Sequence, residues 1–292
     1  MARPRIGLAL GAGAARGWAH IGVVRALAEA GVKPDVVCGT SIGALVGGAL
    51  AAGEFDRLER WVVSLGWKDV LGLVDFGWRS GFIRGEKLFD FFRSKVADRD
   101  IGELAVPFGA VATEIETGRE VWLREGSLMD AVRASIAIPG VFAPVLREGR
   151  VLVDGGLVNP VPVSLCRALG ADIVIAVDLG WAKLGFYRER ARDRAAQAGG
   201  AEARWWERWL PSRGGENGES MPSALNVFMS GMDVMQVRIG RSRLAGEPAD
   251  LLVTPVLPDI RSLEFHRAAE AVAEGRAATE RARPMLEHLL RA

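Results

Sequence analysis

The chain has 292 residues, of which 49% are hydrophobic and 25% are charged, and its formal net charge is +1. This length and composition predict a globular protein with a sizeable core, organised as one large domain or two small ones. The balanced charge excludes the clustered basic surface that nucleic-acid binding requires.

The two cysteines, Cys38 and Cys166, cannot build a disulfide framework, and their spacing is not that of metal ligands. We therefore expect no metal and no organic cofactor. The N-terminal residues lack the long apolar stretch of a secretory signal. No window approaches the ~20 apolar residues of a membrane span. These features favour a cytoplasmic protein, and any membrane contact would be peripheral, at the inner face.

The first third of the chain alternates strand and helix signals. Residues 5–10 predict a short buried strand, and residues 17–30 show helical apolar spacing that ends at Gly31. A second strand at 34–39 continues directly into a helix rich in small residues at 40–53. This β-α-β-α order predicts an α/β fold with a mainly parallel central sheet flanked by helices.

The later segments extend this pattern. In chain order they are helices and turns with several tryptophans at 55–97, strands at 107–115 and 120–123 joined by a turn, a helix at 127–138, a hairpin or strand at 147–156, a strand at 171–179, a helix at 223–244, a strand at 249–257 and a terminal pair of helices. Residues 183–222 are rich in Arg, Glu, Ala, Gly and Ser, which predicts a mobile insertion. We expect a single domain over residues 1–292 that carries this insertion.

Ser41 lies between two glycines, Gly39 and Gly43, in the pattern G-x-S-x-G. In a nucleophile elbow such a serine occupies a strained turn between a strand and a helix, where small neighbours avoid clashes. The predicted strand and helix on either side provide this context, and a helix N-terminus favours negative charge on the serine oxygen. A Gly/Ser turn packed closely against the sheet is the simpler alternative.

Small residues also fill the loop after the first strand, which consists of Gly11, Ala12, Gly13 and Ala14 and is followed by Arg16. A dinucleotide-binding loop would need glycine where Arg16 stands, and an acidic residue where the chain has the Ser41 elbow. An oxyanion hole is the better interpretation, with N–H groups near Gly13 and Ala14 facing the carbonyl that Ser41 attacks. Adjacent parallel strands would bring both loops to one edge of the sheet.

The base that activates Ser41 has two kinds of candidate. Of the three histidines, His266 and His288 lie in Arg/Glu-rich helices that favour solvated side chains, and His20 lies on the first helix. The order Ser41, Asp154, His266 leaves a histidine triad open. However, an α/β-hydrolase elbow follows several strands, and here only two precede it.

Asp154 ends an apolar strand and is followed by Gly155 and Gly156. Its carboxylate would be a poor base in water, but desolvation raises a carboxyl pKa, and a hydrogen bond to a hydroxyl allows proton transfer during attack. The alternative is a turn aspartate that bonds its own backbone, as in many Asp-Gly sequences.

Three segments in this order, GAGAARG, GTSIG and DGG, resemble patatin-like phospholipases. Further matches are ASIAIP at 134–139, FAPV at 142–145 and DGGLVNPVP at 154–162. The resemblance is dense over residues 5–180 and closest to bacterial members similar to neuropathy-target-esterase-like lysophospholipases. It implies a patatin-like fold.

The same resemblance implies roles for individual residues. Ser41 would be the nucleophile and Asp154 the base of a dyad without histidine, supported by Gly39, Gly43, Gly155 and Gly156. The oxyanion hole would come from Gly11, Ala12, Gly13 and Ala14, with Arg16 orienting the loop. Many members have glycine where this chain has Ala12 and Ala14, so any position there with positive φ would be strained.

The expected activity is that of a serine hydrolase that cleaves acyl esters of lipids or lysolipids through an acyl-enzyme. An acyltransferase would use the same acyl-enzyme with an alcohol acceptor. A non-catalytic regulator of the same fold, binding a partner protein or a lipid, is the third possibility. Trp205, Trp206 and Trp209 accompany arginines in the insertion, which suits either a membrane interface or packing onto the domain or another subunit. The sequence predicts no oligomeric state.

Overall fold

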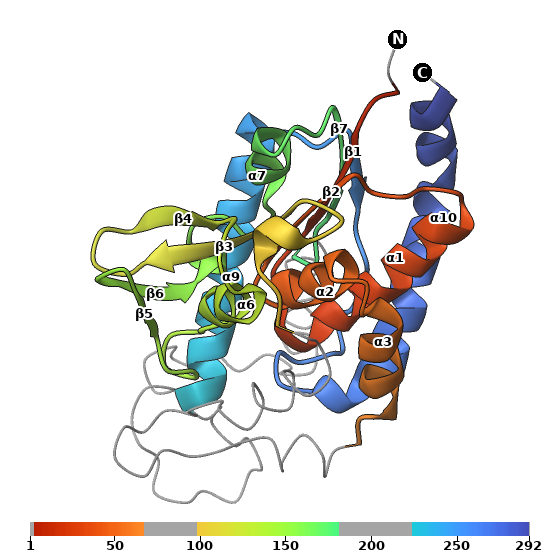
Figure 1. Ribbon diagram of the computed structural model, residues 1–292. Coiled ribbons are helices and arrows are strands. Elements are labelled where there is room, and N and C mark those ends of the chain that lie inside the picture. The colour runs from red at the N-terminus through yellow and green to blue at the C-terminus, as the bar shows by residue number, and fades with distance from the viewer. Residues whose placement is uncertain (1–2, 67–97, 181–223, 292) are drawn as a thin grey trace, which may run out of the picture.

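The computed structural model describes residues 3–66, 98–180 and 224–291 (Figure 1). The insertion expected at 183–222, its tryptophans included, and most of the segment expected at 55–97 lie outside these residues. Within them the predicted α/β class with a mainly parallel sheet is confirmed.

One eight-stranded sheet forms the centre of the described part of the chain. Its strands are β1 (Ile6–Leu10), β2 (Val36–Thr40), β3 (Phe108–Glu114), β4 (Arg119–Leu123), β5 (Val145–Arg147), β6 (Arg150–Asp154), β7 (Ile173–Val177) and β8 (Leu251–Val253). Neighbouring strands follow the order β5-β6-β3-β2-β1-β7-β8, and β4 pairs with β3 away from this path. The pairs along β3-β2-β1-β7-β8 are parallel, whereas β4, β5 and β6 pair antiparallel.

Two strands share one edge of β3. β4 and β6 both pair with residues 112–114 of β3. Because one stretch of a strand has only two edges, β4 and β6 must lie on opposite edges of β3. β2 overlaps β4 along β3 and therefore lies on the same edge as β6. β2 runs parallel and β6 antiparallel to β3, so their carboxyl ends meet. Thr40 is opposite Val111, and Asp154 is opposite the next residue, Ala112.

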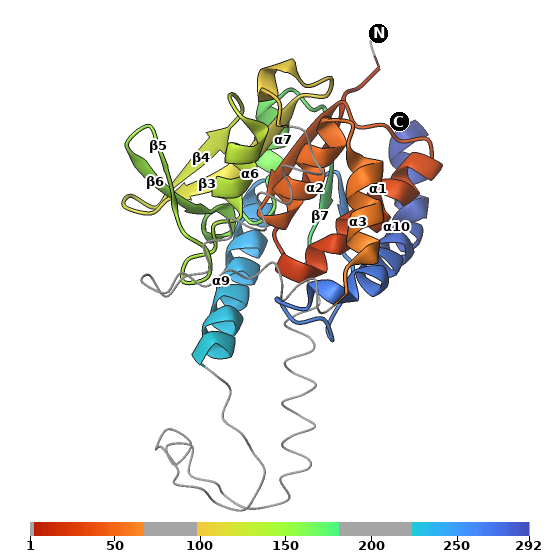
Figure 2. The same cartoon turned by 60° about the horizontal axis from the view of Figure 1, so that its bottom comes forward.

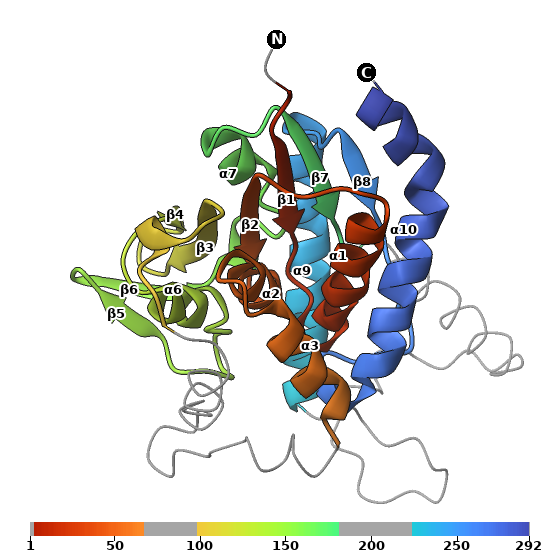
Figure 3. The same cartoon turned by 45° about the vertical axis from the view of Figure 1, so that its right-hand side comes forward.

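Helices cover both faces of the sheet. They are α1 (Ala19–Glu29), α2 (Ile42–Ala51), α3 (Phe55–Ser64), α6 (Leu128–Ser135), α7 (Val163–Ala168), α9 (Ala224–Gly246) and α10 (Ala268–Arg291), with short 3-10 helices η1 (Ala14–Trp18), η2 (Ile101–Glu103), η3 (Gly155–Leu157) and η5 (Phe265–Arg267). Figure 3 shows α9 behind the parallel strands and α1 and α10 in front, and Figure 2 shows α1, α3 and α10 together on one side.

Alternating side chains of the parallel strands enter two cores. On β1, Leu8 and Leu10 join the larger core with α1, α2 and α10, whereas Ala9 joins the smaller core beneath α7. Because both faces are buried, the strands are continuous apolar runs rather than alternating ones, as parallel sheets require. The arrangement holds the carboxyl ends of β1 and β2, and the loops that follow them, at one edge.

Three predicted boundaries differ from the structure. The helix expected at 127–138 ends at Ser135, because the carbonyl of Ala137 accepts the N–H of Asp154 and residues before a proline avoid helical geometry. The strand expected at 249–257 stops at Val253, since Pro255 has no N–H for a ladder. The expected terminal pair of helices is one helix, α10, preceded by the single turn η5.

Candidate active site

Ser41 stands between β2 and α2 in a backbone conformation that few side chains adopt. Its φ is 58° and its ψ is −126°, and it is the N-cap residue of α2. A Cβ on Gly39 would lie 2.3 Å from the Gly43 carbonyl oxygen, and one on Gly43 would lie 2.1 Å from the Leu10 carbonyl oxygen. Both glycines are therefore needed for the sharp turn, which has the geometry of a nucleophile elbow.

Asp154 ends β6 and faces Ser41. The Ser41 hydroxyl donates to Oδ2 of Asp154 at 2.6 Å, and the Gly156 N–H donates to Oδ1 at 2.7 Å. Asp154 is completely buried, and Ser41 is 4% exposed. A Cβ on Gly155 would lie 2.2 Å from the Val111 carbonyl oxygen, so only glycine allows the turn to pass this close to β3. The structure thus brings the predicted pair into direct contact.

Burial controls the charge of Asp154. Desolvation raises its pKa from 3.8 to about 6, although the hydrogen bonds from Ser41 and Gly156 oppose the shift. The carboxyl group therefore exchanges its proton close to neutral pH, where a general base is most effective. Among the described residues, no cation contributes to this pKa and offsets the burial.

Buried hydroxyl groups fix the backbone around this pair. Ser135 accepts the Ser41 N–H at 2.8 Å and donates to the Val111 carbonyl at 2.6 Å. Thr113 donates to the Asp154 carbonyl, and Thr40 donates to the carbonyl of Asn159. Sequence reasoning missed these roles, although Ser135 and Asn159 lie in segments that carried the family resemblance. A buried Ser or Thr in an otherwise apolar segment was the available signal.

The loop after β1 uses some of its N–H groups within the fold and leaves others unused. The Gly11 N–H donates to Val177 and the Ala12 N–H to Pro160. Within the described residues, the N–H groups of Gly13 and Ala14 have no hydrogen-bond acceptor, and both stand at the start of η1. Free donors at a helical N-terminus are suited to binding an anionic oxygen.

The loop packs directly on the elbow. A Cβ on Gly17 would lie 2.0 Å from Cγ2 of Ile42, the residue after the serine. Ala14 adopts a φ of 49°, so the alanine that replaces a glycine of the family pattern does occupy a strained position. The sequence predicted this cost without locating the residue that bears it.

Arg16 is buried beneath the loop. Its Nε donates to the Gly13 carbonyl at 3.3 Å, and its terminal nitrogen binds both carboxylate oxygens of Asp233 and the Ser262 hydroxyl. Arg16 is 5% exposed and Asp233 8% exposed. Sequence reasoning predicted that Arg16 orients the loop, but it missed Asp233 and Ser262, which lie 217 and 246 residues away.

The histidines lie apart from this pair. His266 is exposed on η5, and His288 is exposed near the end of α10. His20 on α1 is fully buried, and its Nε2 lies 2.7 Å from the carbonyl oxygen of Gly11, so it contacts the loop rather than the serine. Burial lowers the pKa of His20 to about 4, which keeps the ring neutral at pH 7.

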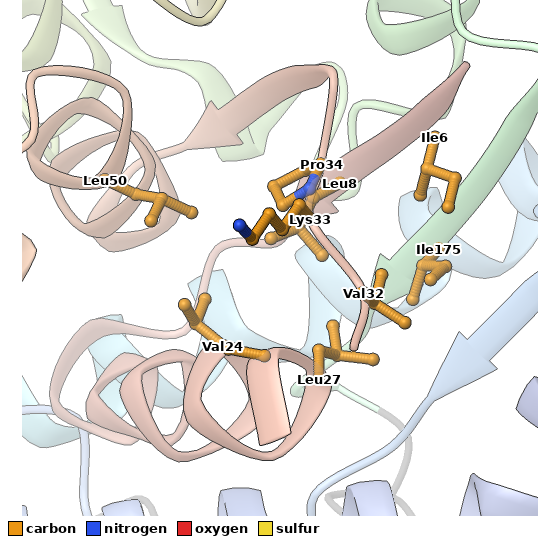
Figure 4. Close-up of a pocket in the computed structure, with 10 residues that line it drawn as sticks. Ile6, Leu8, Val24, Leu27, Val32, Lys33, Pro34, Leu50 and Ile175 are labelled. Carbon is orange, nitrogen blue, oxygen red and sulfur yellow. The ribbon is translucent and has the colours of Figure 1, made fainter. Parts of the chain in front are cut away.

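An apolar pocket of about 140 Å³ lies between α1 and the sheet (Figure 4). Ile6 and Leu8 of β1 and Leu27 of α1 line it, with Lys33 and Pro34 in the loop before β2. It therefore lies toward the amino ends of the strands, away from Ser41. In the described part of the chain no three His, Cys, Asp or Glu side chains gather as metal ligands would.

Comparison with known families gives a match over more than half of the chain. A family model described as patatin-like phospholipase matches residues 8–167. An uncharacterized NTE family protein of Mycobacterium tuberculosis is 36% identical, over 94% of this chain and 90% of its own length.

Two further relatives are much longer than this chain. Patatin-like phospholipase domain-containing protein 7 of Mus musculus is 33% identical over 70% of this chain and 15% of its own length. Lysophospholipase nte1 of Emericella nidulans is 34% identical over 60% of this chain and 12% of its own length.

A solved structure shares the fold. VipD from Legionella pneumophila aligns with a TM-score of 0.50 and 16% identity, covering 96% of this chain and 67% of that one. None of the helices in the described ranges combines the length and the apolar character needed to cross a membrane.

Proposed function

The chain belongs to the patatin-like phospholipase family, and from this premise we propose that it hydrolyses acyl esters of lipids, with Ser41 as nucleophile and Asp154 as general base. The observation that carries the proposal is the 2.6 Å hydrogen bond from the Ser41 hydroxyl to Oδ2 of a buried carboxylate. A nucleophile within hydrogen-bond reach of its base is the arrangement that acyl transfer requires.

The first step forms the acyl-enzyme. As Oγ of Ser41 attacks the ester carbonyl carbon, its proton passes to Oδ2 of Asp154, and the carbonyl oxygen becomes an oxyanion. When the tetrahedral intermediate collapses, the ester C–O bond breaks and the departing alcohol takes the proton from Asp154. In the second step Asp154 takes a proton from water as the water oxygen attacks the acyl carbon. When this tetrahedral intermediate collapses, the bond from the acyl carbon to Oγ of Ser41 breaks, Oγ takes the proton back from Asp154, and the fatty acid is released.

The oxyanion is stabilised in this proposal by the N–H groups of Gly13 and Ala14. They are the loop donors without an internal acceptor among the described residues, whereas Gly11 and Ala12 use their N–H groups to hold the loop against β7 and the segment after η3. We therefore assign Gly11 and Ala12 to the framework of the loop. One such donor contributes roughly 10²- to 10³-fold to the rate of acyl transfer.

Lysophospholipids are the first substrates to test. Relatives that match 60% or more of this chain include a protein named lysophospholipase, and a lysophospholipid presents a single acyl ester. The products expected are a free fatty acid and a glycerophospho-alcohol. Phospholipid vesicles, triacylglycerol and a short p-nitrophenyl ester extend the series from membrane lipid to soluble ester.

The decisive experiment is intact-mass detection of fluorophosphonate labelling on wild type and on Ser41→Ala. The proposal predicts one adduct on the wild type and none on the variant. Ser64→Ala, which removes an exposed hydroxyl at the end of α3, should be labelled like the wild type. A folded wild-type protein without an adduct would refute the hydrolase and favour a binding function.

A further inference from the structure

We infer that Asp233, on α9, is a positioning residue that acts through Arg16 to hold the Gly13–Ala14 loop in the conformation needed for catalysis. The inference rests on the proposed function and extends it to a residue outside the motifs that carry the family resemblance. Asp233 binds the Arg16 guanidinium at 2.8 and 3.0 Å, and Arg16 in turn donates to the Gly13 carbonyl.

The loop needs an external restraint because its own backbone is strained. Ala14 has a φ of 49°, in the left-handed region that an alanine adopts only with strain. Such a conformation persists only when surrounding contacts impose it. The Arg16 bond to the preceding carbonyl is one of these contacts, and the Ala15 N–H bond to the Ser262 carbonyl, at 3.1 Å, is another.

The cluster beneath the loop is buried, and its three side chains are hydrogen-bonded to one another. The Ser262 hydroxyl lies 3.0 Å from the Arg16 terminal nitrogen and 3.2 Å from Oδ2 of Asp233, and each of the three residues is at most 8% exposed. A buried ion pair contributes little more to stability than apolar residues of the same size would. Its benefit is geometric, because both carboxylate oxygens of Asp233 accept charge-assisted hydrogen bonds from one terminal nitrogen of Arg16 and so restrain that end of the guanidinium.

The same face of α9 reaches the other half of the catalytic pair. Gln236 lies three residues after Asp233 and is therefore its neighbour on the helix surface. A Cβ on Gly156 would lie 2.5 Å from Nε2 of Gln236, so this side chain packs directly on the turn after Asp154. One helix thus contacts both the donor loop and the turn that carries the base.

The test compares Asp233→Asn with the wild type in steady-state hydrolysis of a short p-nitrophenyl ester. Asparagine keeps the size of the side chain but removes the charge that binds Arg16. We expect kcat to fall ~10- to 100-fold, because displacement of a catalytic group by about 1 Å has an effect of that size. KM should change less than about threefold, because the donors act on the transition state.

A second measurement does not depend on activity. Amide hydrogen exchange reports the N–H groups of Ala15 and Arg16, whose acceptors are the carbonyls of Ser262 and Gly13. In Asp233→Asn these amides should exchange roughly tenfold faster, since the loop opens more often. Ala14→Gly should increase kcat by a factor about five times larger in Asp233→Asn than in the wild type. Glycine adopts positive φ without strain, so the loop then depends less on the restraint that Asp233 provides.

Asp250→Asn is the matched control. It breaks an Arg–Asp pair of similar length, between Arg167 and Asp250 at 2.6 Å, that joins α7 to the start of β8. The control should retain the wild-type kcat and the wild-type exchange of Ala15 and Arg16. An equal loss in both variants would show general destabilisation and overturn the inference. Unchanged kcat and exchange in Asp233→Asn would overturn it as well.

The two proposals can fail separately. If the wild type neither reacts with a fluorophosphonate nor cleaves the ester, the hydrolase proposal fails, and the exchange measurement still decides whether Asp233 holds the loop. If Asp233→Asn does not fold, Ser262→Ala replaces it, since this variant removes one hydroxyl from the same cluster. We expect its kcat to fall about threefold to tenfold; a wild-type kcat would contradict the inference.

Discussion

Ser41 and Asp154 are 113 residues apart in the chain, and the Ser41 hydroxyl donates to Oδ2 of Asp154 at 2.6 Å. Their contact follows from the way two strands use one edge of β3. β2 runs parallel to β3 and ends opposite Val111, and β6 runs antiparallel and ends opposite Ala112. The strands approach each other head-on, so the residues at their carboxyl ends meet. The contact between the two side chains is thus a product of sheet pairing.

The pH dependence of hydrolysis should report the titration of Asp154. Because only the carboxylate accepts the serine proton, kcat/KM should fall about tenfold per pH unit in acid. The midpoint should lie near the pKa of about 6 that burial imposes on Asp154. Asp154→Asn should lower kcat about a thousandfold while leaving the circular dichroism spectrum unchanged.

Initial rates with a p-nitrophenyl ester from pH 4 to 9 provide this measurement, with the fold checked at each pH. A profile that stays flat down to pH 4 would mean that Asp154 is not the base or is not desolvated. Near-normal turnover by folded Asp154→Asn would exclude the Ser41–Asp154 mechanism.

The same burial should make Asp154 a source of instability at neutral pH. Its pKa is higher in the folded protein than in the unfolded chain, so the folded state binds the proton more tightly between pH 3.8 and 6. The stabilising protonation is complete below pH 3.8 and lost as the pH rises through 6. Asp154→Asn should therefore unfold at a higher urea concentration than the wild type at pH 8. The difference in unfolding free energy, variant minus wild type, should be about 3 kcal/mol larger at pH 8 than at pH 4.

Urea unfolding of both proteins at the two pH values measures this difference. A gap between the variants that does not change with pH would show that Asp154 keeps an ordinary pKa. Wild type more stable than Asp154→Asn at pH 8 would show that the carboxylate is stabilised by contacts rather than destabilised by burial.

His20 should have the opposite effect over a similar range. Burial lowers its pKa to about 4 from 6.5, so the unfolded chain binds the proton more tightly than the folded protein. The stability that a neutral His20 provides is complete above pH 6.5 and lost as the pH falls toward 4, by about 3 kcal/mol. His20→Gln keeps a donor for the Gly11 carbonyl and should remove this acid sensitivity.

The two titrations partly cancel in the wild type. Asp154→Asn should therefore lose more stability than the wild type when the pH falls from 7 to 4.5, because only the His20 titration remains. The double variant with His20→Gln lacks both titrations and should lose less stability than Asp154→Asn alone. Urea midpoints of the four proteins test this. Equal pH dependence with and without His20 would show that burial does not lower the pKa of His20 in the folded protein.

Much of the site was predictable because its signals are local. The Gly39–Gly43 elbow combines a strand, a sharp turn and a helix within a short stretch, and the loop at Gly11–Ala14 does the same. The contacts of Asp233, Ser262 and Ser135 depend instead on which helix packs where, and no neighbouring residue encodes that. β8 was predicted too long because the apolar residues continue beyond Pro255. Hydrogen bonding to the sheet does not continue there, since proline has no N–H to donate.

α1 and α10 pack so closely that two glycines at their contact, Gly22 and Gly275, should not be replaceable by larger residues. A Cβ on Gly22 would lie 1.9 Å from the Val272 carbonyl oxygen, and one on Gly275 would lie 2.0 Å from the Ala19 carbonyl oxygen. Both obstacles are backbone, so the helices would have to separate. Gly22→Ala and Gly275→Ala should each cost about 3 kcal/mol in unfolding free energy.

Gly231→Ala on α9 is the matched control for that prediction. A Cβ there meets no atom of the described residues within 4 Å, so the change should stabilise the helix by up to about 1 kcal/mol. Thermal unfolding of the three variants gives the comparison. Gly275→Ala as stable as the wild type would show that α10 does not pack this closely on α1.

Ser135 should control the nucleophile through the backbone of Ser41. Its hydroxyl accepts the Ser41 N–H and donates to the Val111 carbonyl, so it ties the elbow to β3. Ser135→Ala leaves two buried polar groups unsatisfied, at a cost of about 1–3 kcal/mol each. Because Ser41 is held at a φ of 58°, loss of this bond allows the turn to relax and Oγ to move from Asp154. We expect kcat to fall ~10- to 100-fold.

Ser127→Ala separates this effect from loss of a helix hydroxyl in general. Ser127 caps the other end of α6, where its hydroxyl accepts the Asp130 N–H, and the substitution should lower stability by about 1 kcal/mol without changing kcat. Stopped-flow acylation with a p-nitrophenyl ester locates the step, since a displaced nucleophile slows acyl-enzyme formation. Wild-type acylation by Ser135→Ala would mean that the β3 edge alone aligns Ser41 with its base.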